Sequence, residues 1–106
     1  MIARIWRGRV PAAKADAYLD YLLATGLKDY AQTPGNRGVR ALRRLNGDEA
    51  EFLTLTFWDS LDAVRAFAGP DVDRAVYYPE DDAYLLEKDP TVAHYDVVFE
   101  DQVRGG

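Results

Sequence analysis

The sequence predicts a single α+β domain in which one antiparallel sheet carries two helices on the same face. Segments with strand-like alternation and segments with helical spacing follow one another in the order β-α-β-β-α-β, and a hairpin leads directly into the second helix. The chain has 106 residues, near the commonest size for one domain and too short for two separate cores. We therefore expect one domain over residues 1–106, with its core at about 2–100 and a flexible tail at 101–106.

The chain begins with a strand and a long helix. Residues 2–10 mix Ile, Trp and Val with Arg, which indicates a strand, and Pro11 favours the first turn of a helix. Apolar side chains then recur at helical spacing from residue 12 to about residue 29. They are Ala15, Tyr18, Leu19, Leu22, Leu23 and Leu27. This stripe is wide enough to cover a sheet face, and the Pro and Gly residues of 33–38 then turn the chain.

A β-hairpin is predicted in the middle of the chain. Residues 39–45 and 52–58 are β-prone, and the segment 46–49 between them suits a hairpin loop, so the two runs should pair antiparallel. Because strand side chains alternate, both faces of the second run carry bulk, and both should be covered. One face has Leu53, Leu55 and Phe57, and the other has Phe52, Thr54, Thr56 and Trp58.

The last part of the chain contains a short helix and a final strand. Asp59 or Ser60 can cap the helix, whose apolar stripe ends at Gly69. Residues 72–86 have a partly helical pattern interrupted by proline and acidic residues, so we expect two broken helical turns that could act as a lid. Residues 91–100 alternate as a strand does.

Helices on one face of the sheet leave the other face uncovered. An apolar patch of that size is unusual on the surface of a soluble monomer. A second sheet from another subunit is the simplest cover, so the sequence predicts a homodimer through the sheet face.

Composition argues against several partners. With 18 acidic and 13 basic residues the net charge is -5, which repels a phosphate backbone. We interpret the local cluster of arginines as a solvated hairpin edge, because no aromatic stacking platform accompanies it. The cluster comprises Arg37, Arg40, Arg43 and Arg44. No nucleic acid or membrane partner is expected, and the cytoplasm is the default location because no export signal or long apolar run is visible.

No cofactor is expected from the motifs. The chain has no cysteine and one histidine, so a transition-metal site lacks ligands, and the acidic run at 80–82 lacks the spacing of a calcium loop. The glycines at 35–38 precede a strand, contrary to the dinucleotide-binding pattern.

Four short segments resemble a known family. They are the Pro-Gly-Asn turn at 34–36, the strand-to-helix junction at 57–60, the helix at 62–67 and the His-Tyr-Asp-Val run at 94–97. On these residues the chain resembles the antibiotic biosynthesis monooxygenase domain over roughly residues 2–100. The resemblance implies a ferredoxin-like domain that pairs as a dimeric α+β barrel. The family includes cofactor-independent monooxygenases of aromatic polyketides, quinol monooxygenases, haem-degrading enzymes and proteins of no assigned activity.

The haem-degrading branch of the family can be compared position by position. Its members have an Asn on the first strand, a Trp in the second helix and a haem-ligating His shortly after that helix. This chain has Trp6, Phe67 and Tyr77 at those positions. Haem degradation is therefore disfavoured, although a tyrosine can ligate ferric haem in some proteins, which leaves haem binding open.

The resemblance also implies a small-molecule cavity between the helices and the sheet. Trp6, Phe67, Tyr77 and Tyr78 match positions that line it. The alternative is that they are ordinary core aromatics, which are more common at such spacings. For Tyr77 and Tyr78 the two alternatives are closer to even, because two phenolic hydroxyls are hard to bury without hydrogen-bond partners, which suits a pocket mouth.

His94 is the candidate catalytic base, because the ordinary pKa of histidine lies near neutrality. Asp96 lies on the same strand face, about 6.5–7 Å along the strand, which is too far for an assured hydrogen bond. The alternative is a structural histidine, which is the commoner case on a strand. Arg4 or Arg7 could stabilise an anionic substrate.

The resemblance thus implies a cofactor-independent monooxygenase of a small phenolic or hydroquinone-like substrate. A base would deprotonate the substrate, and the resulting carbanion would react with oxygen to give a quinone, while the protein supplies desolvation and orientation. The alternative is a noncatalytic dimer that binds a small aromatic molecule, for example in a stress response. The direction of the His94 side chain distinguishes the two, because a base must reach the cavity.

Overall fold

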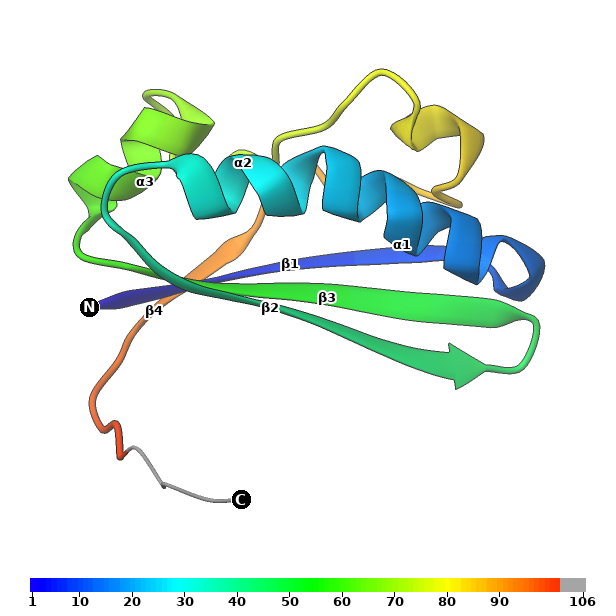
Figure 1. The fold of residues 1–106 in the computed structure, drawn as a ribbon, viewed down its shortest axis with the longest axis horizontal. Coiled ribbons are helices and arrows are strands. Elements are labelled where there is room, and N and C mark those ends of the chain that lie inside the picture. Colours follow the sequence, from blue (N-terminus) through cyan, green and yellow to red (C-terminus); the bar gives the residue numbers. More distant parts are fainter. Residues whose placement is uncertain (102–106) are drawn as a thin grey trace.

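The computed structural model describes residues 1–101, which form a four-stranded antiparallel sheet with helices on one face (Figure 1). Apart from Asp101, the predicted tail at 101–106 lies outside the described residues. The strands are β1 (Ile2–Pro11), β2 (Asn36–Asn46), β3 (Glu49–Trp58) and β4 (Ala93–Asp96), in the spatial order β2-β3-β1-β4. The helices are α1 (Ala15–Ala24), α2 (Gly26–Gln32) and α3 (Leu61–Ala68), with 3-10 turns η1 (Ala12–Lys14) and η2 (Asp81–Ala83). The predicted ferredoxin-like α+β fold is confirmed.

The two long central strands set the faces of the sheet. β1 pairs with β3 over its whole length, with Ile2 opposite Trp58, and β2 pairs with the other edge of β3. The turn between β2 and β3 contains Gly47 at a φ of 63°, a backbone conformation that favours glycine. Alternate residues of β3, from Ala50 to Trp58, are buried under the helices, as the strand alternation predicts.

The helix expected at 12–29 is interrupted and extends further than predicted. It consists of η1, α1 and α2, and the break lies at Thr25, whose φ and ψ are -121° and -96°. The Thr25 hydroxyl donates to the Tyr21 carbonyl at 2.7 Å. Thr25 and Gly26 are adjacent weak helix formers, so the chain bends there at little cost. A β-carbon on Gly26 would lie 3.7 Å from the Tyr78 ring, so this bend brings the helix backbone close to the segment after α3.

Helix α3 begins and ends where the sequence predicts. The Ser60 hydroxyl caps it by accepting a hydrogen bond from the Ala63 amide at 3.2 Å, and the helix is followed by Gly69 at a φ of 88°. The turn before β2 packs against this helix, and a β-carbon on Gly35 would lie only 2.5 Å from that of Ala63. Within residues 1–101, none of the helices combines the length and the apolar character needed to cross a bilayer.

The segment after α3 differs from the sequence prediction. Of the two broken helical turns expected at 72–86, only the 3-10 turn η2 forms, because Pro79 cannot continue a helix and the Tyr78 amide bonds to the Asp81 side chain at 2.6 Å. The final strand is also shorter than the predicted 91–100. β4 lies at the sheet edge and Asp96 pairs with Ile2, so the pairing stops where β1 begins.

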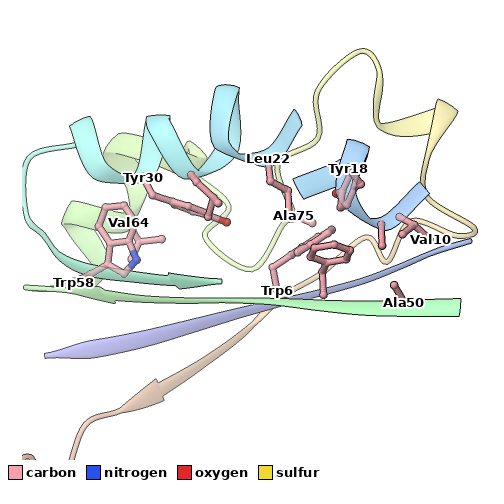
Figure 2. Packing of buried hydrophobic residues seen from close by; sticks show 12 residues of the cluster. Trp6, Val10, Tyr18, Leu22, Tyr30, Ala50, Trp58, Val64 and Ala75 are labelled. Atoms are coloured by element: carbon pink, nitrogen blue, oxygen red, sulfur yellow. The ribbon is translucent and has the colours of Figure 1, made fainter. Parts of the chain in front are cut away.

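The core lies between the sheet and the helices and is rich in aromatic rings (Figure 2). Tyr18 of α1 packs edge-on against Phe52, with 5.2 Å between ring centroids. Tyr30 of α2 packs against Phe67 of α3 at 4.5 Å and against Trp58 at 6.3 Å. These aromatic side chains are therefore buried together on the helix side of the sheet.

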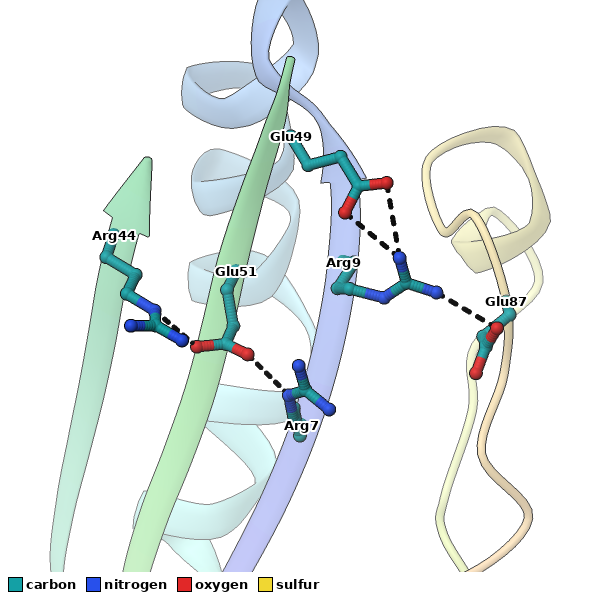
Figure 3. Close-up of polar contacts among 6 residues, drawn as sticks. All are labelled: Arg7, Arg9, Arg44, Glu49, Glu51 and Glu87. Carbon is teal, nitrogen blue, oxygen red and sulfur yellow. Dashed lines mark hydrogen bonds and ion pairs between the residues drawn. The ribbon is translucent and has the colours of Figure 1, made fainter. Parts of the chain in front are cut away.

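The other side of the sheet, which we call the open face, is apolar at its centre and charged at one end. Strand register places on it Ile5, Leu42, Leu53, Leu55, Phe57 and Tyr95. At the charged end, Glu51 accepts hydrogen bonds from Arg7 at 2.5 Å and Arg44 at 2.8 Å, which ties β3 to both of its neighbours (Figure 3). Arg9 contacts Glu49 and Glu87 close by. This face is left uncovered by the helices.

Candidate functional site

A small cavity lies between the sheet and the helices, and we call it the inner cavity. Its volume is about 20 Å³, which is room for roughly one water molecule. Its polar lining consists of Tyr18, Tyr30, Thr54, Tyr78 and Asp81, and its aromatic lining includes Trp6 and Phe67. Figure 2 shows Tyr18 and Tyr30 on either side of Leu22 beneath α1 and α2, with Trp6 rising from the sheet toward them.

A larger hollow, which we call the outer hollow, lies next to the inner cavity. It has a volume of about 490 Å³ and is lined by residues of α2, α3 and the segment after α3. Phe67, Val76 and Tyr78 line both spaces. These three side chains form the partition, so their displacement would join the outer hollow to the inner cavity.

Tyr78 is the polar member of this partition. Its hydroxyl donates to the Asp29 carboxylate of α2 at 2.5 Å, which ties the segment after α3 to the helix. Burial raises the pKa of Tyr78 above its ordinary value, and the adjacent Asp29 carboxylate raises it further. Tyr78 therefore remains a neutral hydrogen-bond donor at physiological pH.

Asp81 places a buried carboxylate at the inner cavity. Its side chain accepts a hydrogen bond from the Tyr78 amide at 2.6 Å and a longer one from the Tyr18 hydroxyl at 3.4 Å. The residue is 4% exposed, and burial raises the pKa of its carboxyl, while these two donors partly offset the rise. No ion pair among residues 1–101 involves Asp81.

Arg4 places a buried positive charge behind the wall of the inner cavity. Its guanidinium donates to the Tyr30 hydroxyl and to the Arg74 carbonyl, each at 3.2 Å, and lies 5.5 Å from the centroid of the Phe67 ring. Arg4 is 1% exposed, and its Nε has no partner among the described residues. The Tyr30 hydroxyl lies 3.4 Å from Thr54 Oγ1, and Tyr30 lines the inner cavity, so it stands between Arg4 and this space.

The sequence-predicted site residues fall in different places. Trp6, Phe67 and Tyr78 come together at the inner cavity. Tyr77 does not line it: its hydroxyl donates to the Asp89 carbonyl at 2.5 Å and accepts from Trp6 Nε1 at 3.4 Å. Arg7 points to the open face, where it pairs with Glu51.

His94 lies on the helix side of the sheet, in register with Arg4, but it lines neither the inner cavity nor the outer hollow. Its Nδ1 is 3.1 Å from Asp73, so the aspartate that contacts it is not Asp96. Its Nε2 is buried and has no partner among the described residues. This packed position is what a structural histidine would have.

Sequence reasoning missed Asp81, Tyr30 and Asp29. In the sequence, Asp81 is only one member of an acidic run with the wrong spacing for calcium. Tyr30 lay just beyond the predicted end of the first helix, although it continues the helical spacing of Tyr18 and Leu22. Following that spacing past the bend at Thr25 could have found Tyr30, whereas nothing in the local sequence distinguishes Asp81 from its acidic neighbours.

The comparison with protein families shows which family the chain belongs to. The family model described as antibiotic biosynthesis monooxygenase matches residues 1–72, about two thirds of the chain. The chain belongs to this family. No curated protein sequence was found to be significantly similar to it.

Solved structures share the fold of this antibiotic biosynthesis monooxygenase domain. A protein from Bacillus cereus, proposed to be an antibiotic biosynthesis monooxygenase, is 13% identical with a TM-score of 0.66, covering 96% of this chain and 97% of its own. The haem-degrader MhuD from Mycobacterium tuberculosis, solved with two haems in its active site, is 23% identical with a TM-score of 0.58, covering 96% and 100%. Rv0793 from the same organism is 20% identical with a TM-score of 0.53, covering 97% and 98%. These identities support the shared fold alone.

The described residues do not fit an iron porphyrin. Haem iron takes an axial His, Cys, Met or Tyr, and tyrosines are the only such residues that line the inner cavity or the outer hollow. The hydroxyl of Tyr78 is held by Asp29, that of Tyr18 contacts Asp81, and that of Tyr30 accepts from Arg4. An inner cavity of about 20 Å³ is also far smaller than a porphyrin.

Proposed function

We propose that this chain is a cofactor-independent monooxygenase that oxidises a small phenolic or hydroquinone-like substrate beneath its helices. The observation that carries the proposal is the pair of adjoining spaces with aromatic walls and buried polar groups, the larger of about 490 Å³. That volume lies within the range of about 300–1,000 Å³ typical of small-molecule sites. Membership of the monooxygenase family supports the same assignment.

A phenol can supply all the electrons that this reaction needs. The overall change is phenol plus O₂ giving quinone plus water: one oxygen atom replaces the hydrogen on the ring carbon para to the hydroxyl, and the other leaves as water. The substrate loses four electrons and O₂ gains four, so no external reductant takes part. The protein has to hold the ring, exclude water and accept the phenolic proton.

The position of His94 gives no support to its role as the base. Its Nδ1 contacts Asp73 at 3.1 Å, and its side chain lines neither the inner cavity nor the outer hollow. A general base has to come within hydrogen-bond reach of the proton that it takes, directly or through one water. The proton acceptor is therefore better sought among the groups that line the cavity.

Isotope labelling tests the proposed reaction. We expect the protein to convert 1-naphthol to 1,4-naphthoquinone under ¹⁸O₂ with one labelled oxygen in the quinone and without stoichiometric hydrogen peroxide. Heat-denatured protein is the control for autoxidation. Unlabelled quinone, or a rate equal to that control, would contradict the proposal.

A pair of substitutions at Gly26 tests whether the reaction takes place at the inner cavity. Gly26 lines this cavity, and its missing β-carbon would lie 3.7 Å from the Tyr78 ring. Gly26→Leu should fill the cavity and lower kcat/KM by about 100-fold, as misplacement of a substrate does. Gly26→Ala adds one methyl at an ordinary contact distance and should retain most of the activity. Full activity in a folded Gly26→Leu protein would place the reaction elsewhere.

A noncatalytic aromatic-binding protein is the second candidate. It is favoured by the small volume of the inner cavity, about 20 Å³, which admits no ring without displacement of the partition. Binding of 1-naphthol, detected by quenching of Trp6 and Trp58 fluorescence, in the absence of labelled quinone would support this function instead.

The homodimer is part of the proposal. The open face exposes 46% of Leu42 and 58% of Tyr95, beside the apolar side chains of Leu53, Leu55 and Phe57. Packing this face against the same face of a second copy would cover these side chains by an isologous contact. Each subunit would keep its own site, because the inner cavity lies on the opposite side of the sheet.

A further inference from the structure

The strongest unassigned feature is the carboxylate of Asp81. It is the one acidic side chain that lines the inner cavity among residues 1–101, and at 4% exposure it is almost completely removed from solvent. Asp29, the acidic residue of the outer hollow, already accepts the short hydrogen bond from Tyr78. Asp81 is therefore the acceptor that a ligand in the inner cavity would meet.

The hydrogen bonds of Asp81 leave it able to accept a further proton. An ionised carboxylate has about four lone-pair sites. One is used at 2.6 Å by the Tyr78 amide, and another, more weakly, at 3.4 Å by the Tyr18 hydroxyl. No cation pairs with it among the described residues, so a proton delivered by a ligand would remove an uncompensated buried charge.

A structural role explains only part of this arrangement. The Tyr78 amide donates to Asp81 and the Asp81 amide donates back to the Tyr78 carbonyl at 3.0 Å, which closes a turn. An asparagine oxygen could accept the first bond equally well, without the desolvation penalty of a buried charge. The negative charge is thus not needed for the turn.

We propose that Asp81 is the general base of the site and accepts the proton of the phenolic substrate. This inference rests on the function proposed above. The phenolic O–H bond breaks, the proton goes to the Asp81 carboxylate, and the electron pair delocalises from the substrate oxygen onto the ring carbon that reacts with O₂. A C–O bond to O₂ then forms at that carbon, and the C–H bond there breaks as the O–O bond breaks. The departing oxygen takes the ring hydrogen as a proton, together with the proton from Asp81, and leaves as water, so the carboxylate is regenerated and the overall reaction is unchanged.

The surroundings of Asp81 set the pH range in which it can act. Burial raises the pKa of Asp81, the Tyr78 amide, the Tyr18 hydroxyl and the more distant Lys88 lower it, and Asp82 raises it. The net direction is upward, which brings the acceptor closer to a phenol, whose pKa is about 10. Activity should therefore rise with pH as Asp81 loses its proton.

Asp81→Asn is the direct test, and Asp82→Asn is its matched control. Both change one carboxylate of the same turn to an amide, but Asp82 is exposed and pairs with Lys88 at 2.8 Å. At pH 7, Asp81→Asn should lower kcat/KM for 1-naphthol by about 100-fold or more, the contribution typical of a general base. Asp82→Asn should stay close to the wild-type rate.

The pH dependence separates a base from a residue that only holds the turn. The deficit of Asp81→Asn should shrink as the pH approaches about 10, where the phenol ionises without help. A deficit that stays constant with pH, or no deficit in a protein with wild-type circular dichroism, would overturn the proposal.

A binding measurement tests Asp81 even if the chain proves not to be an oxygenase. The probe is 4-nitrophenol, whose phenolate absorbs at longer wavelength than the neutral form. At a pH where the free probe is mostly neutral, wild-type protein should increase the phenolate band and Asp81→Asn should not. An equal band with both proteins, or no increase with the wild type, would refute proton acceptance by Asp81, whereas a missing quinone product alone would refute only the oxygenase function.

Discussion

Two buried charges distinguish this site at the scale of single residues. Arg4 and Asp81 are 1% and 4% exposed, and neither has an oppositely charged partner among residues 1–101. Arg4 donates hydrogen bonds to the Tyr30 hydroxyl and the Arg74 carbonyl. Asp81 accepts hydrogen bonds from the Tyr78 amide and the Tyr18 hydroxyl. Buried charges with only neutral partners add little to stability, so their presence points to a function at the inner cavity, which Asp81 lines and which Arg4 approaches through Tyr30.

This view predicts the effect of replacing Arg4 by a side chain of similar size. Arg4→Met keeps most of the packing against Phe67 and removes a charge that neutral acceptors do not balance. We expect the free energy of unfolding to change by less than about 1 kcal/mol, or to increase. Turnover of 1-naphthol should fall, because Tyr30 loses the donor that polarises its hydroxyl.

Urea unfolding and initial rates measured on the same preparation check this prediction. Arg74→Met is the control, because Arg74 accepts the hydrogen bond from Arg4 through its backbone carbonyl, which the substitution keeps. A loss of several kcal/mol in Arg4→Met alone would show that Arg4 is mainly structural.

At the scale of elements, two features have separate roles. The bend between α1 and α2 shapes the inner cavity, and the ion pairs of β3 join the central strands. The bend at Thr25 places Gly26 beside the Tyr78 ring, so it shapes the inner cavity. Glu51 lies on the opposite face and joins β3 to Arg7 of β1 and Arg44 of β2. One feature shapes the site, and the other holds the central strands in register.

Glu51 makes a contribution to stability that depends on pH. The hydrogen bond from Arg7 is the main cause that lowers the pKa of Glu51 below its ordinary value of 4.5, and Arg44 adds to it. Because the folded state has the lower pKa, this stabilisation is fully present above pH 4.5 and is lost as the pH falls through the folded value.

Glu51→Gln should therefore lower the melting temperature at pH 7, and the difference from wild type should disappear at acidic pH. Thermal unfolding, followed by circular dichroism between pH 7 and pH 3, measures this difference in melting temperature. Asp20→Asn, on the exposed side of α1, serves as the control and should show no such pattern. A Glu51→Gln difference that is the same at all pH values would assign the effect to packing instead of charge.

At the scale of the whole molecule, the two sides of the sheet differ in what they present. The helix side encloses the cavities, whereas the open face presents an apolar centre with Leu42 exposed to 46%. A chain with a net charge of -5 gains solubility from its surface charges, but the apolar side chains of the open face still favour association, although Arg7 and Arg40 lie among them.

A charged residue on the open face should therefore dissociate the proposed homodimer. Leu42→Glu places a carboxylate at this face, and Leu23→Glu makes the same change on α1, where the leucine is 56% exposed. Sedimentation velocity should give a dimer for the wild type and for Leu23→Glu, and a monomer for Leu42→Glu. A wild-type monomer at micromolar concentration would refute the dimer.

Local patterns in the sequence predicted the elements but not all of their limits. The alternation of β3, the cap at Ser60 and the stop at Gly69 depend on neighbours within a few positions, and the structure confirms them. The bend at Thr25 and the early end of β4 were missed. The bend accommodates Tyr78, far along the chain, and β4 ends opposite the start of β1, where one more backbone bond, from Val97 to Met1, follows the ladder.

The sequence by itself determined the order of the elements and the faces of the strands, because these follow from periodicities that each segment carries alone. Only the tertiary structure decided which polar groups meet at the cavity. Asp81 becomes a buried acceptor because Tyr18, 63 positions earlier, packs over it, and His94 is held away from the cavity by Asp73. Burial and hydrogen bonding between distant residues are properties of the folded chain, so no local pattern could rank Asp81 above His94.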